Sequence, residues 1–238
     1  MWTTIKSVFG NSYLHPRHIA QREIANFVRA EGIKLNGLLL DVGCGRKPYG
    51  KWLPNIERHM GVDMPSTMHG PEHADVWASA LALPFPDATF DSVLCTEVLE
   101  HTPDPAVGLR EMARVSKAGS LLVLTVPFSE QLHEKPYDFC RFTSYWLEHL
   151  LKITGWEILQ LRPRGGAWLE LGFRVSSFLY TSFGATSDEH GKLTPRPIAS
   201  FLVIPACAGV QIFSSIMDKL LPSNIGTMGY GVVARRRI

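Results

Sequence analysis

The sequence predicts an α/β fold with a doubly wound parallel sheet. A continuous apolar run, GLLLDVGCG at residues 37–45, ends in glycines, as a buried parallel strand followed by a tight turn does. Shorter strand-like runs follow it, and helical stretches separate several of them, which is typical of a sheet with helices on both faces. The 238 residues, 45% hydrophobic and 19% charged, are enough for one globular α/β domain with an elaboration.

The helices are predicted from caps and apolar spacing. The first begins at Pro16, because proline suits the first helical position and apolar residues then recur at helical spacing. Another covers Asp104–Lys117, where the aspartate can cap the helix and Gly119 can end it. A third runs from Thr143 to Gly155 with Trp146, Leu147, Leu150 and Leu151 on its inward face, and Trp146 and Trp156 are both expected in the core. The shorter strands are predicted at His59–Asp63, Ala74–Ala78, Phe90–Cys95, Leu121–Val126 and Trp156–Leu161.

Charge and cysteine content exclude some classes of protein. Twenty-four Lys and Arg against 22 Asp and Glu give a formal net charge of +2, so there is no basic footprint for nucleic acid, and no nucleic-acid partner is expected. None of the four cysteines forms a CxxC pair, and the N-terminal segment MWTTIKSVFG lacks a signal-peptide apolar run. We therefore expect a cytoplasmic protein.

The turn after the first strand is the predicted ligand site. Asp41, Gly43 and Gly45 lie at the carboxyl end of a strand, where ligands bind in such sheets. Asp63 closes the next strand, and a carboxylate there can accept two hydrogen bonds from ribose hydroxyls. NAD and S-adenosylmethionine both use this geometry. A GxGxxG fingerprint would need glycine at position 48, however, and Pro48 disfavours an NAD-dependent oxidoreductase.

A longer motif carries a family resemblance. ALALPFPDATFDSVLCTEVLEHTPDP at residues 80–105, with DVGCG upstream and REMARVSKAGSLLVLTVP downstream, closely resembles the class I S-adenosylmethionine-dependent methyltransferases, in the type 11 methyltransferase-domain group. The resemblance spans Leu38–Leu161. It implies a Rossmann-like, seven-stranded fold and an enzyme that methylates an oxygen or nitrogen of a small-molecule or lipid-linked acceptor. A non-catalytic S-adenosylmethionine-binding module is the alternative.

The resemblance also implies roles for individual residues. Asp41, Gly43 and Gly45 would pack against the methionine part of the cofactor, Asp63 would bind its ribose, Ser79 and Ala80 would flank adenine, and Thr96 and Glu97 would face the sulfonium. The family often has a third glycine where Lys47 stands and an acid where Ser79 stands. Asp75 or a backbone carbonyl is then needed to accept the adenine amino group.

The candidate catalytic residues are Glu97, His101 and His133. Glu97, Glu100 and His101 form ExxEH, which on a helix would share one face and could hold Mg²⁺ or Mn²⁺, as a similar motif does in ubiquinone-pathway O-methyltransferases. We favour the structural alternative, in which Glu100 and His101 bond neighbouring loops and no metal is held.

The segment HEKPYDFCRFT at residues 133–143 resembles a recurrent acceptor-side segment of the family. His133 is its candidate proton acceptor, because imidazole titrates near neutral pH. The alternative is that Asp138 and Arg141 pair to hold the loop and His133 is solvated. The other histidines, His59 among them, are scattered without ligand spacing, and surface or packing roles are expected for them.

The predicted organisation is an N-terminal helical segment at 1–36, a core at 37–161, a helical insertion at 162–228 and a final strand at 229–238. The insertion is too long for a hairpin loop. Its expected parts are an amphipathic helix with Leu171, Val175 and Phe178 on the apolar face, a loop TSDEHGKLTPRP, and an uncharged stretch Pro197–Met217 that Pro205 interrupts.

Three alternatives remain open for this insertion: a helical cap over the acceptor pocket, which we prefer, a peripheral membrane or dimer contact, and a membrane span. The span ranks last, because a single crossing would separate residues 229–238 from their sheet.

Overall fold

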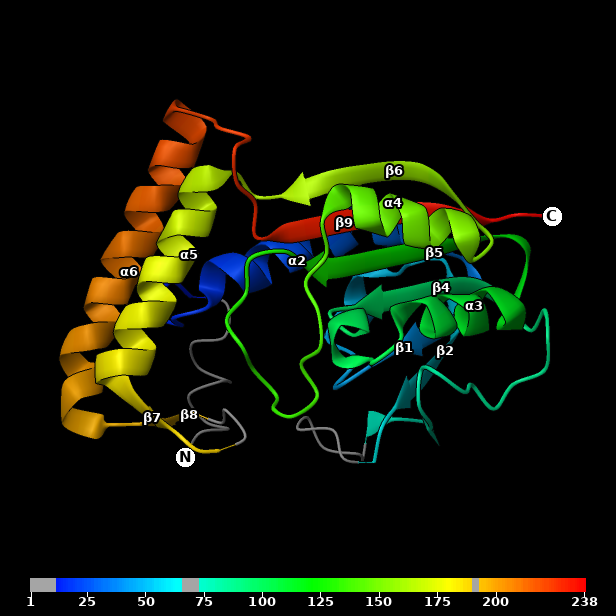
Figure 1. The fold of residues 1–238 in the computed structure, drawn as a ribbon, viewed down its shortest axis with the longest axis horizontal. Coiled ribbons are helices and arrows are strands. Elements are labelled where there is room, and N and C mark those ends of the chain that lie inside the picture. Colours follow the sequence, from blue (N-terminus) through cyan, green and yellow to red (C-terminus); the bar gives the residue numbers. More distant parts are fainter. Residues whose placement is uncertain (1–11, 66–72, 190–192) are drawn as a thin grey trace. The chain divides into compact units, whose positions relative to one another are not determined.

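The chain divides into two compact units (Figure 1). The computed structural model describes residues 12–65, 73–189 and 193–238, so part of the predicted 1–36 segment lies outside the described residues. The first unit, here called the sheet unit, comprises Ala25–Phe128, Tyr137–Arg162 and Gly229–Ile238. The second, the helical unit, comprises the described residues up to Ile24, Ser129–Pro136 and Pro163–Met228.

Seven strands form one sheet in the order β3-β2-β1-β4-β5-β9-β6. The strands are β1 Gly37–Val42, β2 Ile56–Asp63, β3 Val76–Trp77, β4 Phe90–Thr96, β5 Ser116–Pro127, β6 Trp156–Arg164 and β9 Gly229–Arg236. Pairing is parallel from β3 through β2, β1 and β4 to β5, whereas β9 runs antiparallel to β5. The predicted fold, a Rossmann-like seven-stranded doubly wound sheet with a helical insertion before the last strand, is confirmed.

Both faces of the sheet are covered, as its continuous apolar strands predict. Val232 and Ala234 of β9 belong to the core cluster that also holds buried residues of α3 (Pro105–Val115) and α4 (Ser144–Ile153). Gly231 alternates with Val232 and so faces the other side. A Cβ at Gly231 would lie 2.5 Å from the ring of Phe27, which belongs to α2 (His18–Glu31). Only glycine allows α2 to approach the sheet this closely.

Side-chain caps set the starts of two helices. The carboxylate of Asp104 accepts hydrogen bonds from the backbone N–H groups of Ala106 (3.0 Å) and Val107 (3.1 Å) at the start of α3. Thr143 caps α4 in the same way. The predicted end of the first of these helices at Lys117 is wrong, because α3 ends at Val115 and the extended chain of β5 begins at once.

The two tryptophans assigned to the core differ. Trp156 is fully buried and donates from Nε1 to the carbonyl of Leu109 at 3.1 Å. Trp146 is 45% exposed and stacks on His149, so its predicted inward position is wrong. The inward positions predicted for Leu147, Leu150 and Leu151 on the same helix are confirmed, because these three side chains are buried.

The helical unit contains α5 (Ala167–Leu179), the π-helical turn Tyr180–Gly184, the two-stranded sheet β7 (Ala185–Ser187) and β8 (Leu193–Pro195), and α6 (Pro197–Leu220). Helices α5 and α6, yellow and orange in Figure 1, lie side by side. The segment TSDEHGKLTPRP, predicted as a loop, includes residues of both short strands, because β7 extends to Ser187 and β8 covers Leu193–Pro195.

Two predictions about these helices are wrong. Leu171, Val175 and Phe178 are exposed, whereas the buried face of α5 carries Leu169 and Phe173 together with small residues. Pro205 does not interrupt the second helix, and α6 continues through it over 24 residues. A proline removes one helical hydrogen bond, and this one stands on the exposed side of a long helix.

Candidate functional site

The carboxyl ends of the parallel strands converge at the point where the strand order reverses, between β1 and β4. Ligands of doubly wound sheets bind outside this point. The sheet places Gly43 directly after β1 and Thr96 at the end of β4, on the two sides of the reversal. Asp63 ends the neighbouring strand β2. The structure thus brings these three predicted residues to one edge of the sheet.

The glycines after β1 are required by the backbone. Gly43 has φ +66°, and a Cβ there would lie 2.2 Å from Cγ2 of Val98. Gly45 has φ +48° and donates its N–H to Oδ2 of Asp63 at 2.9 Å. The turn therefore lies close to Val98, which follows β4, and at both glycines it presents backbone and no side chain to a ligand.

Asp63 is held by two backbone donors. Besides Gly45, the N–H of Met64 donates to Oδ1 at 2.8 Å. An ionised carboxylate offers about four acceptor positions. About two positions thus remain for a ligand with two adjacent hydroxyl groups.

A buried Asp–His pair lies beside this turn. His59 Nε2 is 2.7 Å from Oδ2 of Asp41, whose side chain is almost completely buried. Burial raises the pKa of Asp41, and the hydrogen bond with His59 only partly opposes this. Sequence patterns do not predict this role of His59, because the contact depends on the pairing of β1 with β2 and has no local signal.

Lys47 occupies the position where the family often has glycine, and its φ of +50° is in the region that glycine favours. Its Nζ lies 2.5 Å from Oδ2 of Asp75, which also accepts the N–H of Gly61 at 2.7 Å. Partial burial raises the pKa of Asp75, but these two hydrogen bonds outweigh it and lower the pKa overall. Asp75, a suggested adenine acceptor, therefore has one oxygen committed to Lys47 and Gly61.

Ser79 and Ala80 form the turn after β3. The hydroxyl of Ser79 accepts the N–H of Leu81 at 3.1 Å, and its carbonyl accepts the N–H of Ala82 at 3.0 Å. Ala80 is buried. The preceding residue, Ala78, donates its N–H to the carbonyl of Asp63, which ties this turn to the end of β2.

ExxEH does not lie on one helical face. Glu97 has φ +53°, and only Leu99–His101 form a single 3₁₀ turn. The N–H of Glu97 donates to the carbonyl of Thr125 on β5 and not to a carbonyl one helical turn earlier. The helix on which Glu97, Glu100 and His101 would share one face is therefore not formed.

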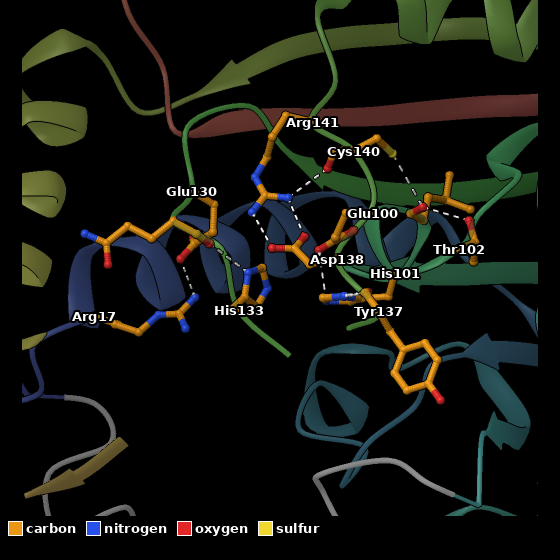
Figure 2. A network of polar contacts seen from close by, with 12 residues as sticks. Arg17, Glu100, His101, Thr102, Glu130, His133, Tyr137, Asp138, Cys140 and Arg141 are labelled. Carbon is orange, nitrogen blue, oxygen red and sulfur yellow. Dashed lines mark hydrogen bonds and ion pairs between the residues drawn. The ribbon is translucent and has the colours of Figure 1, made fainter. Parts of the chain in front are cut away.

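Glu100 and His101 tie this turn to the segment that begins at Tyr137 (Figure 2). His101 Nδ1 lies 2.7 Å from the carbonyl oxygen of Tyr137, and the carbonyl of Glu100 accepts the N–H of Phe139 at 2.8 Å. A carbonyl only accepts, so Nδ1 carries the proton. His101 Nε2 lies 3.8 Å from Oε1 of the fully buried Glu100. These bonds agree with the structural role that the sequence favoured.

The predicted pairing of Asp138 with Arg141 is confirmed (Figure 2). The guanidinium donates to both carboxylate oxygens, at 2.6 and 2.9 Å. It also donates to the carbonyl of Cys140 at 2.8 Å, which fixes the loop shape. His133 belongs to the helical unit, where its Nδ1 lies 3.0 Å from the carbonyl of Gln131. Its role as proton acceptor stays a prediction.

The thiols of the sheet unit are not activated. Burial raises the pKa of Cys44 to about 12 and that of Cys140 to about 11, and it raises the pKa of Cys95 well above the ordinary thiol value. These three cysteines remain protonated at neutral pH and do not supply a thiolate nucleophile.

The segment that forms this edge of the sheet is similar to known proteins. Residues 40–124 match the family model described as a methyltransferase domain. An uncharacterized methyltransferase of Mycobacterium leprae is 40% identical over 97 residues, which are 37% of this chain and 36% of that protein. The O-methyltransferase resE of Aspergillus sclerotiorum is 28% identical over 222 residues, 84% of this chain and 75% of that protein.

A ubiquinone biosynthesis O-methyltransferase of Albidiferax ferrireducens is 31% identical over 142 residues, which are 53% of this chain and 50% of that enzyme. With the exception of resE, the chain thus spans half or less of the length of these relatives. The match to resE shows that similarity extends beyond residues 40–124.

Solved structures share the fold. A SAM dependent methyltransferase from Archaeoglobus fulgidus has a TM-score of 0.54 at 17% identity and covers 99% of both chains. The [4+2]-cyclase SpnF has a TM-score of 0.56 at 20% identity, covering 92% of this chain and 81% of its own. At these identities the likeness establishes the fold and not the reaction.

Proposed function

Because residues 40–124 of this chain are a methyltransferase domain, we propose that the protein transfers a methyl group from S-adenosylmethionine to an oxygen or nitrogen of a small-molecule or lipid-linked acceptor. The observation that carries the proposal is the set Gly43, Gly45 and Asp63 at the carboxyl edge of the sheet. The names of two O-methyltransferase relatives favour oxygen as the methylated atom.

The residues at this edge fit the cofactor. Asp63 retains about two acceptor positions for the two ribose hydroxyls. Gly43 and Gly45 leave room for the methionine part, because neither carries a side chain. When bound, S-adenosylmethionine supplies a methyl group on a sulfonium, which leaves by in-line displacement without a change in redox state.

The protein's contribution is mainly to hold donor and acceptor in line, an effect worth up to about 7 to 11 kcal/mol in favourable systems. Thr96, the last residue of β4, and Glu97, directly after it, are the proposed residues on the sulfonium side. A hydroxyl acceptor must also lose a proton. In His101 the Nδ1 proton is held by the carbonyl of Tyr137, so Nε2 is the nitrogen that can accept one, with the Glu100 carboxylate 3.8 Å away to stabilise the imidazolium.

A second candidate function is an S-adenosylmethionine-binding protein that does not transfer methyl groups. The observation that favours it is the similarity to SpnF, whose name is that of a cyclase. The fold is therefore compatible with a reaction other than methyl transfer.

Two measurements separate these functions. Calorimetry with S-adenosylmethionine, its demethylated product and NAD should give micromolar binding for the first two and poor binding for NAD. Turnover is then measured with methyl-labelled cofactor against panels of hydroxyl and amine acceptors, with and without a chelator. Binding without label transfer to any acceptor would favour the second function, and absence of binding would refute both.

A further inference from the structure

The outward face of α6 is a continuous apolar surface. Ile198, Phe201, Leu202, Ile212, Phe213 and Ile216 are all exposed, with Ile198 at 88% and Phe201 at 80%, and we call these six residues the outer stripe. No charged residue occurs between Arg196 and Asp218. By length and composition α6 could cross a membrane, and only 33% of its most apolar window is buried within the structure.

The area of this surface is large for a protein in water. An aromatic side chain presents roughly 150–250 Å². At 80% and 57% exposure, Phe201 and Phe213 alone contribute on the order of 200–340 Å². The largest apolar patch of a typical monomer is about 300–600 Å², and the four other stripe residues extend the surface further.

The inward face of α6 has the opposite composition. Its buried residues are Ser200, Cys207, Ala208, Gln211, Ser214 and Ser215, and none of its Ile, Leu or Phe side chains is among them. Gly172 of α5 meets this face so closely that a Cβ would lie 2.2 Å from Ser214 Oγ. An amphipathic helix in water buries its large apolar residues. Small residues at the helix contact and large apolar ones outside are typical of helices that face lipid.

The polar groups on the inward face are satisfied within the helical unit. Gln211 accepts the N–H of Ile19 at 3.1 Å and donates to the carbonyls of Tyr13 and His15, both at 3.1 Å. The hydroxyl of Ser200 donates to the carbonyl of Gly184 at 2.6 Å. Internal pairing of this kind is what an apolar medium demands of polar groups.

The hairpin formed by α5 and α6 returns to its starting point. Ala167 donates its N–H to the carbonyl of Ser223 at 3.0 Å, and Met228 donates to that of Arg164 at 3.3 Å. Because the two helices are joined at this base, the hairpin can contact the acyl region of a bilayer while the chain before α5 and the chain after α6 stay on the same side of the membrane. The objection to a single membrane span, which would separate the last strand from its sheet, does not apply to such a contact.

Charges lie at both ends of α6. Arg196 precedes it, and Asp218 and Lys219 stand in its last turn. Only one face of α6 is open to lipid, because the other packs within the helical unit through Gln211 and its small residues, so α6 lies along the membrane surface rather than across it. We propose that the outer stripe docks on a lipid bilayer, with its side chains in the acyl region and the charged ends at the headgroups.

A second copy of the chain explains the pattern less well. Interfaces between water-soluble proteins bury apolar residues in addition to those of each monomer's own core. Val203 and Ile204 of α6 pack, partly buried, against the core of the helical unit, but none of the Ile, Leu or Phe side chains of this helix is fully buried. An apolar medium along its whole length accounts for both of its faces.

Flotation of the full chain with phosphatidylcholine–phosphatidylglycerol vesicles tests this proposal. The wild-type chain should float with the vesicles. The double variant Phe201→Asn, Leu202→Asn should partition at least about tenfold less, because both side chains are exposed and leave the acyl region. The matched control is Tyr145→Asn, an exposed aromatic on α4 that should float within about twofold of the wild type.

Gly209→Leu separates lipid from a protein partner. Gly209 is exposed and a Cβ there has no atom within 4 Å, so a leucine side chain can extend into solvent and add apolar surface, and vesicle binding should be retained. The proposal is overturned if the wild-type chain stays in the lipid-free fraction, if the double variant floats equally well, or if Gly209→Leu abolishes binding. Light scattering gives a further test. The proposal is also overturned if the wild-type chain is a dimer, the double variant is a monomer, and neither protein binds vesicles. Cofactor binding is measured in parallel, so a failure here is distinguishable from a failure of the proposed function.

Discussion

Replacing Asp63 with alanine removes the proposed ribose acceptor and is the most direct test of the cofactor site. The carboxylate accepts two backbone N–H groups, which leaves about two acceptor positions for the two hydroxyls of a ribose. Loss of such partners should weaken binding by about 1 to 3 kcal/mol, or roughly 5- to 150-fold in the dissociation constant. Calorimetric titration of wild type and variant with S-adenosylmethionine measures this difference.

Asp91→Ala is the matched control. Asp91 also accepts a backbone N–H, from Leu38 at 2.9 Å, and it pairs with Lys117 at 2.6 Å, but it stands near the start of β4 rather than at the carboxyl edge. Both variants should lose comparable stability in thermal unfolding, whereas only Asp63→Ala should lose cofactor affinity. Equal affinity of Asp63→Ala and wild type, or equal weakening by the control, would refute the assignment of Asp63 to the ribose.

Three further predictions concern Gly43 and Asp41 of the sheet unit and the two candidate catalytic histidines. Gly43→Ala should lower the free energy of unfolding by about 2 to 5 kcal/mol, because φ is +66° and the new methyl would meet Val98, and adding Val98→Ala should recover part of the loss in urea unfolding. The pKa of Asp41 is raised in the folded protein, so its contribution to the free energy of unfolding is complete below the unfolded value of about 3.9 and is lost as the pH rises through the folded pKa. The wild type should therefore lose stability relative to Asp41→Asn as the pH rises above about 4, and parallel curves would contradict this. Alanine at His101 or His133 should lower turnover, by roughly 100-fold or more for the residue that accepts the proton, while cofactor affinity stays within about threefold; unchanged turnover in both would leave the two histidines structural.

Local signals in the sequence determined the elements and the cofactor edge. Asp104 and Pro105 mark the start of α3 because capping depends on residues within one turn. The apolar run before Gly43 predicts a buried parallel strand, and the carboxyl ends of such strands meet at one edge of a sheet. The strand ends therefore predicted that Gly43 and Asp63 lie at this edge, and the family resemblance added Thr96.

Contacts between distant segments were decided by tertiary structure. His59 meets Asp41, and Lys47 meets Asp75, only because strand pairing and the left-handed turn at Lys47 place them together. Glu97 leaves the helical conformation because the chain reverses after β4.

The orientation of α6 about its own axis also depends on contacts with distant segments. Its composition is apolar throughout, so the sequence predicts that something covers it but not which side faces inward. The close approach of Gly172 and the hydrogen bonds of Gln211 set that rotation, placing small and polar residues inside and the outer stripe outside. Residue patterns predict local structure. In a helix that is apolar on all sides, however, the face that is buried depends on which segments pack against it in the folded chain.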